Sequence, residues 1–398
     1  MVPGPGSHAH ARLGLAAIFG STFLELIGYF MLLPLLLLRL KGADVSSSVA
    51  GLFAACGWAG IFLFTPFSSW VAQGLGRRPA LWLAAAIPAL ASLGFALTDD
   101  LATWFALELL AGAASGLRWV LAEAIVAEFA PQGQRGRYVG LFETMVGTTF
   151  VIGPAVLVWV GPSSPEALWV AIGFIMAGLL WTFLVPEMPP AADAATSAVG
   201  IRGVWHALLR HPIIMLAGFV GGFFESGVTS ILPLYGLALG WTGAASALLV
   251  AASGLGSAVM MLPVGVIADR FMDQAAGRRS LMVVLAWMTL GATIAVPLVG
   301  HLVWLAWPVV FLWGGAGGSL YTLAMIDIGA REQGVTLVNS TAVLVLTYTF
   351  GSMAASATSG FLLQWSATAG FPALLASVAG IGCYALMRAR RAGSTHTV

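Results

Sequence analysis

The segments FLELIGYFMLLP (Phe23–Pro34) and FFESGVTSILP (Phe223–Pro233) decide the fold of this chain. Each is an apolar run that carries one glutamate, then a glycine, and then a proline six residues after that glycine. The two glutamates, Glu25 and Glu225, are about 200 residues apart, which is the trace that duplication of a bundle of membrane helices leaves in a sequence. The pattern therefore predicts two related halves.

Two shorter matches recur at nearly the same separation. The triplet GRR stands at 76–78 and again at 277–279, and the pair Leu-Ala stands at 121–122 and again at 323–324. Each match alone is weak, whereas three at nearly the same offset support a repeat.

The composition places both halves in a membrane. Of the 398 residues, 59% are hydrophobic and 8% are charged, and the mean hydropathy is +0.95. Soluble proteins carry roughly a quarter charged residues, so this composition excludes a soluble globular domain. The net charge of +1 and the scattered basic residues exclude a nucleic-acid-binding surface. Cys56 and Cys383 lie in apolar runs without metal-ligand spacing, so no metal and no other cofactor is expected.

The apolar runs are continuous and long enough for helices, which need roughly 20 residues to cross the hydrocarbon. They predict an all-α polytopic membrane protein with twelve transmembrane helices in two pseudo-symmetric six-helix bundles. The expected spans lie near residues 12–38, 48–72, 79–98, 102–129, 138–161, 166–185, 212–238, 244–268, 280–300, 303–329, 335–364 and 370–388. Residues 1–185 are expected to form the N-terminal bundle, 186–211 a polar cytoplasmic linker, and 212–398 the C-terminal bundle with a short cytoplasmic tail.

Basic residues indicate the orientation, because short loops rich in arginine stay in the cytoplasm. With both termini inside and twelve spans, only Arg39 and Lys41 face outward, and Arg118 lies within a span. The arginines that then face the cytoplasm are Arg12, Arg77, Arg78, Arg135, Arg137, Arg202, Arg210, Arg270, Arg278, Arg279, Arg331, Arg388, Arg390 and Arg391. This bias supports an even number of spans. The expected location is the inner membrane of a bacterium.

Twelve spans, a central linker and GRR after the second and eighth spans resemble the major facilitator superfamily. Four stretches resemble, more narrowly, its bacterial YcaD-like branch: AGAASGLRWVLAEA (Ala111–Ala124), GRY (Gly136–Tyr138), GGSLYTLAM (Gly317–Met325) and LVNSTAVLVLTYTFGS (Leu337–Ser352). The resemblance implies a transporter whose two halves rock around a central cavity.

The resemblance also implies a cytoplasmic gate, because the family's loop motif acts as a charge relay that latches helix ends. The first copy has Ser69 and Gln73 where the motif has glycine and aspartate, and the second copy keeps Gly265 and Asp269. The latch is therefore expected to use another carboxylate, such as Asp269 or Asp273. With Asp327, which spacing pairs with Arg331 on one helix face, the expected gate residues are Gly76, Arg77, Arg78, Asp269, Arg278, Arg279, Asp327 and Arg331.

A glycine-proline pattern in the fifth span resembles the motif of proton-coupled drug antiporters. It consists of Gly147, Gly153 and Pro154. The alternative is that these residues only allow close helix packing or a kink.

An ionisable side chain in a span is costly unless it faces a cavity or a partner, so each one is a functional candidate. Glu25 and Glu225 lie near mid-span at equivalent places of the repeat. An acid there can hold a proton in a dry cavity and release it when water or a cation arrives. The alternative is a protonated carboxyl group that only hydrogen-bonds a neighbouring helix.

Arg118 stays charged and needs an anionic partner, for which Glu25, Glu108, Glu123 and Glu143 are the candidates. The motif of the family gives Arg118 no role, because the place of the family's span-four arginine holds Glu108 here. Glu123 lies about 140° from Arg118 around the helix, so these two do not share a face.

The remaining candidates follow from residue type. The candidate proton-coupling residues are Glu25, Glu225, Glu123 and Glu108, and the candidate residues of a substrate cavity are Arg118, Asn339, Tyr321, Tyr348, Trp119 and Trp58. Glu128 and Glu143 are expected to form plain salt bridges near Arg135 and Arg137.

These features predict a secondary active transporter that exports a small apolar or amphipathic compound in exchange for protons. The alternative is proton-coupled uptake or exchange of an anionic metabolite with Arg118 as its counter-ion. No GxxxxGK motif is present, so ATP is not expected to drive transport, and no GxSxG elbow or paired histidine supports an enzyme acting on lipid. A non-transporting receptor is the remaining rival. The expected partners are a small molecule, protons and lipid, and the expected state is a monomer.

Overall fold

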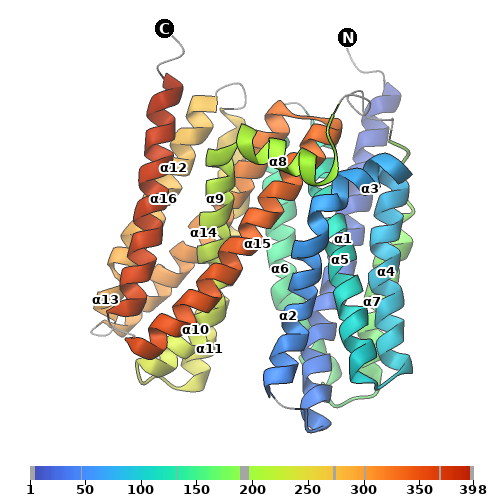
Figure 1. Ribbon diagram of the computed structural model, residues 1–398, viewed down its shortest axis with the longest axis horizontal. Helices are drawn as coiled ribbons and strands as arrows, with labels where there is room; N and C mark the ends of the chain where they lie inside the picture. Colours follow the sequence, from blue (N-terminus) through green and yellow to red (C-terminus); the bar gives the residue numbers. More distant parts are fainter. Residues whose placement is uncertain are drawn as a thin grey trace. The chain divides into compact units, whose positions relative to one another are not determined.

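The computed structural model describes residues 5–45, 47–131, 133–188, 197–271, 275–299, 302–366 and 369–394, and these are overwhelmingly helical (Figure 1). The chain forms two compact units. Unit 1 contains Met1–Ala130, Thr148–Ala207 and Glu332–Val345, and unit 2 contains Pro131–Gly147, Leu208–Arg331 and Leu346–Val398. The predicted bundle boundaries at residues 185 and 212 stay a prediction.

The helices of the first half of the chain begin with α1. They are α1 (Pro5–Gly42), α2 (Ser47–Phe64), η1 (Thr65–Phe67), α3 (Ser68–Leu75), α4 (Arg77–Leu97), α5 (Leu101–Phe129), α6 (Arg135–Val160), α7 (Glu166–Thr182) and α8 (Gly200–Arg210). The second half continues with α9 (Pro212–Gly222), η2 (Phe223–Gly227), α10 (Val228–Ala238), α11 (Gly243–Asp269), α12 (Ala275–Ile294), α13 (Val296–Val299), η3 (Val303–Leu305), α14 (Ala306–Arg331), α15 (Gly334–Trp365) and α16 (Gly370–Ser394).

The predicted fold class, an all-α polytopic membrane protein, is confirmed. Ten helical segments of the described residues are long and apolar enough to cross a membrane. The other two predicted spans coincide with α7, a shorter apolar helix of 17 residues, and with α12 followed by α13. One feature of the predicted linker was missed, because part of it forms the helix α8.

Local sequence sets several helix ends. Gly76 ends α3 and precedes α4 with a φ of +86°, a conformation that favours glycine. Asp100 caps α5, and its carboxylate accepts hydrogen bonds from the Thr103 hydroxyl at 2.6 Å and the Thr103 backbone amide at 2.8 Å. Because these bonds stabilise the ionised form, they lower the pKa of Asp100.

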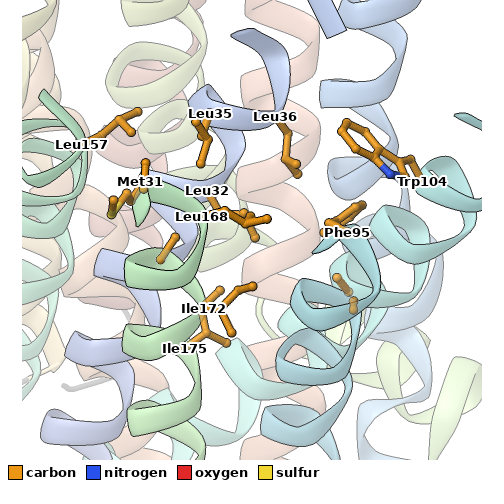
Figure 2. Packing of buried hydrophobic residues seen from close by; sticks show 14 of the residues in the cluster. Met31, Leu32, Leu35, Leu36, Phe95, Trp104, Leu157, Leu168, Ile172 and Ile175 are labelled. Atoms are coloured by element: carbon orange, nitrogen blue, oxygen red, sulfur yellow. The ribbon is translucent and has the colours of Figure 1, made fainter. Parts of the chain in front are cut away.

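Unit 1 has an apolar core in which α1 is central (Figure 2). From α1 come Met31, Leu32, Leu35 and Leu36, and from the helices around it come Phe95, Trp104, Leu157, Leu168, Ile172 and Ile175. The α1 residues recur at the three- and four-residue spacing of one helix face. This core holds α1 against α7 and so fixes the position of Glu25 within unit 1.

In both units helices cross at glycine, and one pair from each illustrates this. In unit 1, a Cβ on Gly112 of α5 would lie 2.1 Å from the carbonyl oxygen of Gly57 in α2. In unit 2, a Cβ on Gly314 of α14 would lie 2.0 Å from the carbonyl oxygen of Ser253 in α11. The backbones are therefore in direct contact in both places, as small residues allow in membrane helices.

Gly256 provides a test of this crossing. A Cβ there would lie 2.0 Å from the carbonyl oxygen of Phe311, whereas a Cβ on Gly254 of the same helix would meet nothing within 4 Å. We expect Gly256→Ala to destabilise the protein by about 1–3 kcal/mol, because the helices must move apart. Gly254→Ala is the matched control and should be neutral or slightly stabilising, because alanine favours helix. Thermal unfolding in detergent compares the two, and equal Tm values would contradict the close crossing.

Candidate functional site

Arg118 of α5 is paired with Glu25 of α1 inside unit 1. The Arg118 Nε atom lies 2.5 Å from Glu25 Oε2, and both side chains are only 6% exposed. Arg118 Nη1 also donates to the hydroxyl of Thr182 at 3.3 Å. Of the four acids considered as partners, the structure brings Glu25 to Arg118, which balances a charge that would otherwise be costly in a span.

Glu225 has a different environment in unit 2. It lies in η2, a π-helical turn between α9 and α10, and is partly exposed. The Ser257 hydroxyl lies 2.6 Å from Oε1 and the Tyr348 hydroxyl lies 3.1 Å from Oε2. Within the described residues no arginine or lysine forms an ion pair with Glu225. Its partners are therefore neutral, although its place in the repeat is that of Glu25.

The other two acidic candidates lie on α5. Glu108 is buried, and its Oε1 atom has no hydrogen-bond partner among the described residues. A Cβ on Gly57 would lie 2.5 Å from that atom, so the carboxyl group packs against the α2 backbone. Glu123 accepts a hydrogen bond from the Trp119 indole at 2.5 Å.

The cavity candidates belong to different units. In unit 2 the rings of Tyr321 and Tyr348 meet edge to face, with centroids 5.0 Å apart. In unit 1 the Asn339 amide donates to the carbonyl oxygen of Ala198 at 2.8 Å, and Trp58 is partly buried on α2. Asn339 thus holds the chain just before α8.

The gate candidates form an arginine–carboxylate pair in each unit. In unit 1, Arg77 pairs with Glu128 at the end of α5. In unit 2, Arg278 and Arg331 each lie 2.7 Å from a carboxylate oxygen of Asp327. The expected pairing of Asp327 with Arg331 is confirmed. Glu128 forms a plain salt bridge as expected, but its partner is Arg77 of α4 rather than Arg135 or Arg137.

Asp269, one of the two carboxylates expected to serve the latch, connects the end of α11 to the start of α6. Its two oxygens accept hydrogen bonds from the backbone amides of Gly136, at 2.6 Å, and Arg137, at 2.9 Å. These amides lie in the first turn of α6, where the helix dipole favours a negative charge. Asp269 therefore fixes α6 on α11, and Asp273 lies outside the described residues.

The remaining motif residues lie at helix contacts or near the surface. A Cβ on Gly153 would lie 2.7 Å from the Phe30 side chain, so α6 approaches α1 closely there, one residue before Pro154. A Cβ on Gly147 would meet nothing closer than 4.0 Å. Arg78 stacks on Trp82 and lies 3.4 Å from Glu187, and Arg279 is partly exposed.

Residues 18–337 match the profile of the Major Facilitator Superfamily. The chain belongs to this family. Among similar proteins, the uncharacterized MFS-type transporter YfkF of Bacillus subtilis is 26% identical over 267 residues, or 64% of each chain. The uncharacterized MFS-type transporter YcaD of Salmonella typhimurium is 25% identical over 366 residues, or 90% of each chain. The predicted resemblance is therefore confirmed.

Solved structures of the superfamily share the fold. The human organic anion transporter MFSD10 superposes with a TM-score of 0.79 at 17% identity, covering 94% of this chain and 99% of that one. The Escherichia coli fucose:proton symporter FucP gives 0.73 at 16% identity, covering 94% and 98%. These identities show the fold alone, and this transporter must be interpreted from its own residues.

Sequence reasoning missed two residues of the site, Ser257 and Thr182. Ser253 and Ser257 are four residues apart on the mostly apolar helix α11, so they share one face, and that spacing is a signal. Thr182 ends α7 and gave no such signal.

The buried ion pair predicts a non-additive pair of substitutions. Arg118→Gln alone leaves the Glu25 carboxylate without its cation and should destabilise this transporter by about 3–5 kcal/mol. Glu25→Gln alone leaves the Arg118 guanidinium without its anion and should destabilise the protein to a similar extent. The double variant removes both charges and should recover most of the loss. Unfolding of the three variants in detergent measures this, and additive losses would argue against the pair.

Two arginines of the GRR triplets should differ in their effect on stability. Arg278 is 3% exposed and Asp327 is fully buried, whereas the Arg78 and Glu187 side chains are 27% and 89% exposed. Arg278→Ala removes the buried one of the two arginines that balance Asp327, leaves Arg331 as its remaining cation, and should lower Tm. Arg78→Ala removes a solvent-screened pair and should change stability by at most about 1 kcal/mol. Similar Tm values for both variants would contradict this assignment.

Proposed function

We propose that this transporter works by alternating access and exports a small apolar or amphipathic compound in exchange for protons, with Glu225 as the residue that carries the proton. Its proposed setting is the inner membrane of a bacterium, as a monomer with both termini in the cytoplasm. One proton that moves inward contributes about 2.3 kcal/mol per 100 mV, which supports a concentration ratio of about fifty.

The hydroxyl of Ser257 carries this proposal. It lies 2.6 Å from Glu225 Oε1 and 3.0 Å from the carbonyl oxygen of Gly314. A serine hydroxyl has one proton, and a backbone carbonyl only accepts hydrogen bonds. When Glu225 is ionised, Ser257 donates to the carboxylate. When Glu225 is protonated, Glu225 donates to Ser257 and Ser257 donates to Gly314. Both protonation states are thus hydrogen-bonded in the same geometry.

Glu25 supports the assignment by contrast. Its carboxylate is buried and faces Arg118, so a proton that binds there would leave the guanidinium unbalanced. Glu225 is partly exposed and has neutral partners, so it can exchange a proton without stranding a charge. We therefore assign proton coupling to Glu225 and a charge-balancing role to Glu25.

The alternative cargo is an anionic metabolite bound by Arg118. MFSD10 is an organic anion transporter and FucP is a proton symporter, so both behaviours occur on this fold. Because Arg118 already faces Glu25 at 2.5 Å, an anion must first displace a carboxylate. Charge balance in unit 1 therefore favours a neutral or cationic cargo.

The proton site is tested by two flux assays on proteoliposomes. A compound library is first screened for compounds that cause proton release from the purified protein. A compound that does so is then used as the cargo. We expect Glu225→Gln to abolish transport driven by an imposed pH gradient while cargo-for-cargo counterflow continues, because a glutamine amide cannot release a proton. Tyr348→Phe keeps the acid and should retain gradient-driven transport.

Glu25→Gln is the matched comparison, since it removes the equivalent acid of the other half. It should reduce gradient-driven transport and counterflow to the same extent, because it disturbs the fold and not the coupling of transport to protons. Gradient-driven transport at the wild-type rate in Glu225→Gln would refute the assignment. Uptake of the cargo with inward proton flow would refute export.

A further inference from the structure

Helix α8 lies in the connection between the two halves of the chain and is not an apolar span. In Figure 1 it runs across the direction of α2 and α5. Its sequence, GIRGVWHALLR, includes no acidic residue. Apolar, basic and small residues alternate along it, so its faces differ in chemistry.

Small residues on one face of α8 hold it on unit 1. Gly200, Gly203 and Ala207 are buried. The backbone amide of Gly200 donates to the Ser69 hydroxyl at 2.9 Å, and a Cβ on Gly203 would lie 2.4 Å from Asn339 Oδ1. This contact leaves no room for a side chain and fixes which faces of α8 point away from the protein.

The face that points away carries large apolar side chains. Ile201, Trp205 and Leu209 are 63%, 57% and 62% exposed, and their spacing of four residues places them in one stripe. Trp70 of α3, which is 63% exposed, borders the start of α8, because a Cβ on Gly200 would lie 3.8 Å from its Cβ. An isolated exposed leucine is ordinary. An aligned apolar stripe that includes a tryptophan instead indicates that another apolar surface covers it.

A second stripe runs beside the first and is basic. Arg202, His206 and Arg210 each follow a residue of the apolar stripe by one position and are exposed. A helix with an apolar stripe, a tryptophan and a basic border matches the boundary between lipid tails and headgroups. Because every charge on α8 is positive, the complementary surface is an anionic one.

We propose that α8 is an interfacial helix that binds the anionic phospholipid surface of the membrane. The stripe Ile201, Trp205 and Leu209 enters the acyl boundary, and the basic stripe contacts phosphate groups. In the predicted orientation this is the cytoplasmic leaflet. The connection between the halves is then attached to the bilayer, independently of cargo and proton.

Spin labels test the proposal on the full chain in nanodiscs. Single cysteines are introduced as Ile201→Cys, Trp205→Cys, Leu209→Cys and His206→Cys after Cys56→Ser and Cys383→Ser. In bilayers that contain phosphatidylglycerol, labels at 201, 205 and 209 should collide more with oxygen than with a water-soluble nickel chelate. The label at 206 should show the reverse. Monodisperse elution and an unchanged Tm establish that each variant is folded.

The anionic headgroup is tested separately. Burial of the 205 label should be greater with phosphatidylglycerol than with phosphatidylcholine alone, and Arg202→Gln should reduce that difference at least twofold. Arg270→Gln changes an exposed arginine on another loop and should leave it intact. If labels at 201, 205 and 209 meet the nickel chelate as readily as the label at 206, the stripe faces water or a protein and the proposal is wrong. Equal burial in both lipids would overturn the anionic partner.

Discussion

Every charged side chain inside a membrane span needs an opposite charge, a change of protonation state or contact with water, and this constraint organises both halves of the chain. Glu25 and Glu225 stand at equivalent places of the repeat, yet they meet it differently. Glu25 has Arg118 at 2.5 Å, whereas Glu225 has two hydroxyl groups. A duplicated position has thus diverged in chemistry, because one half kept an ion pair and the other kept an acid with neutral partners.

Charged side chains at the helix ends also have partners, and there the partners join neighbouring helices. The arginines of both GRR triplets, Arg77 and Arg278, find carboxylates at the ends of α5 and α14. The Asp269 carboxylate instead accepts hydrogen bonds from backbone amides at the start of α6. Carboxylates at the ends of spans therefore hold helices together, whereas Glu225, within its span, is hydrogen-bonded to two hydroxyl groups.

Sequence periodicity and composition were sufficient for the fold, because a membrane span needs a long apolar run and the loops are marked by arginine. The repeat singled out Glu25 and Glu225 as a pair. It did not distinguish them, since the distinction comes from residues far away in the chain, Arg118 and Ser257. The pairing of Arg77 with Glu128 was missed for the same reason, as it depends on how α4 packs on α5. Helix α8 was missed because it is too short and too polar to register as a span.

The glycine crossings have a mechanical consequence. Where backbone touches backbone, as at Gly112 on Gly57 and Gly314 on Ser253, the helices cannot pack closer, and a movement that brings a side chain into the contact would cause a steric clash. Each such helix pair is therefore expected to move as one rigid unit. A displacement at one end of such a helix pair is then transmitted to its other end. Bending is therefore expected in the segments that connect the pairs.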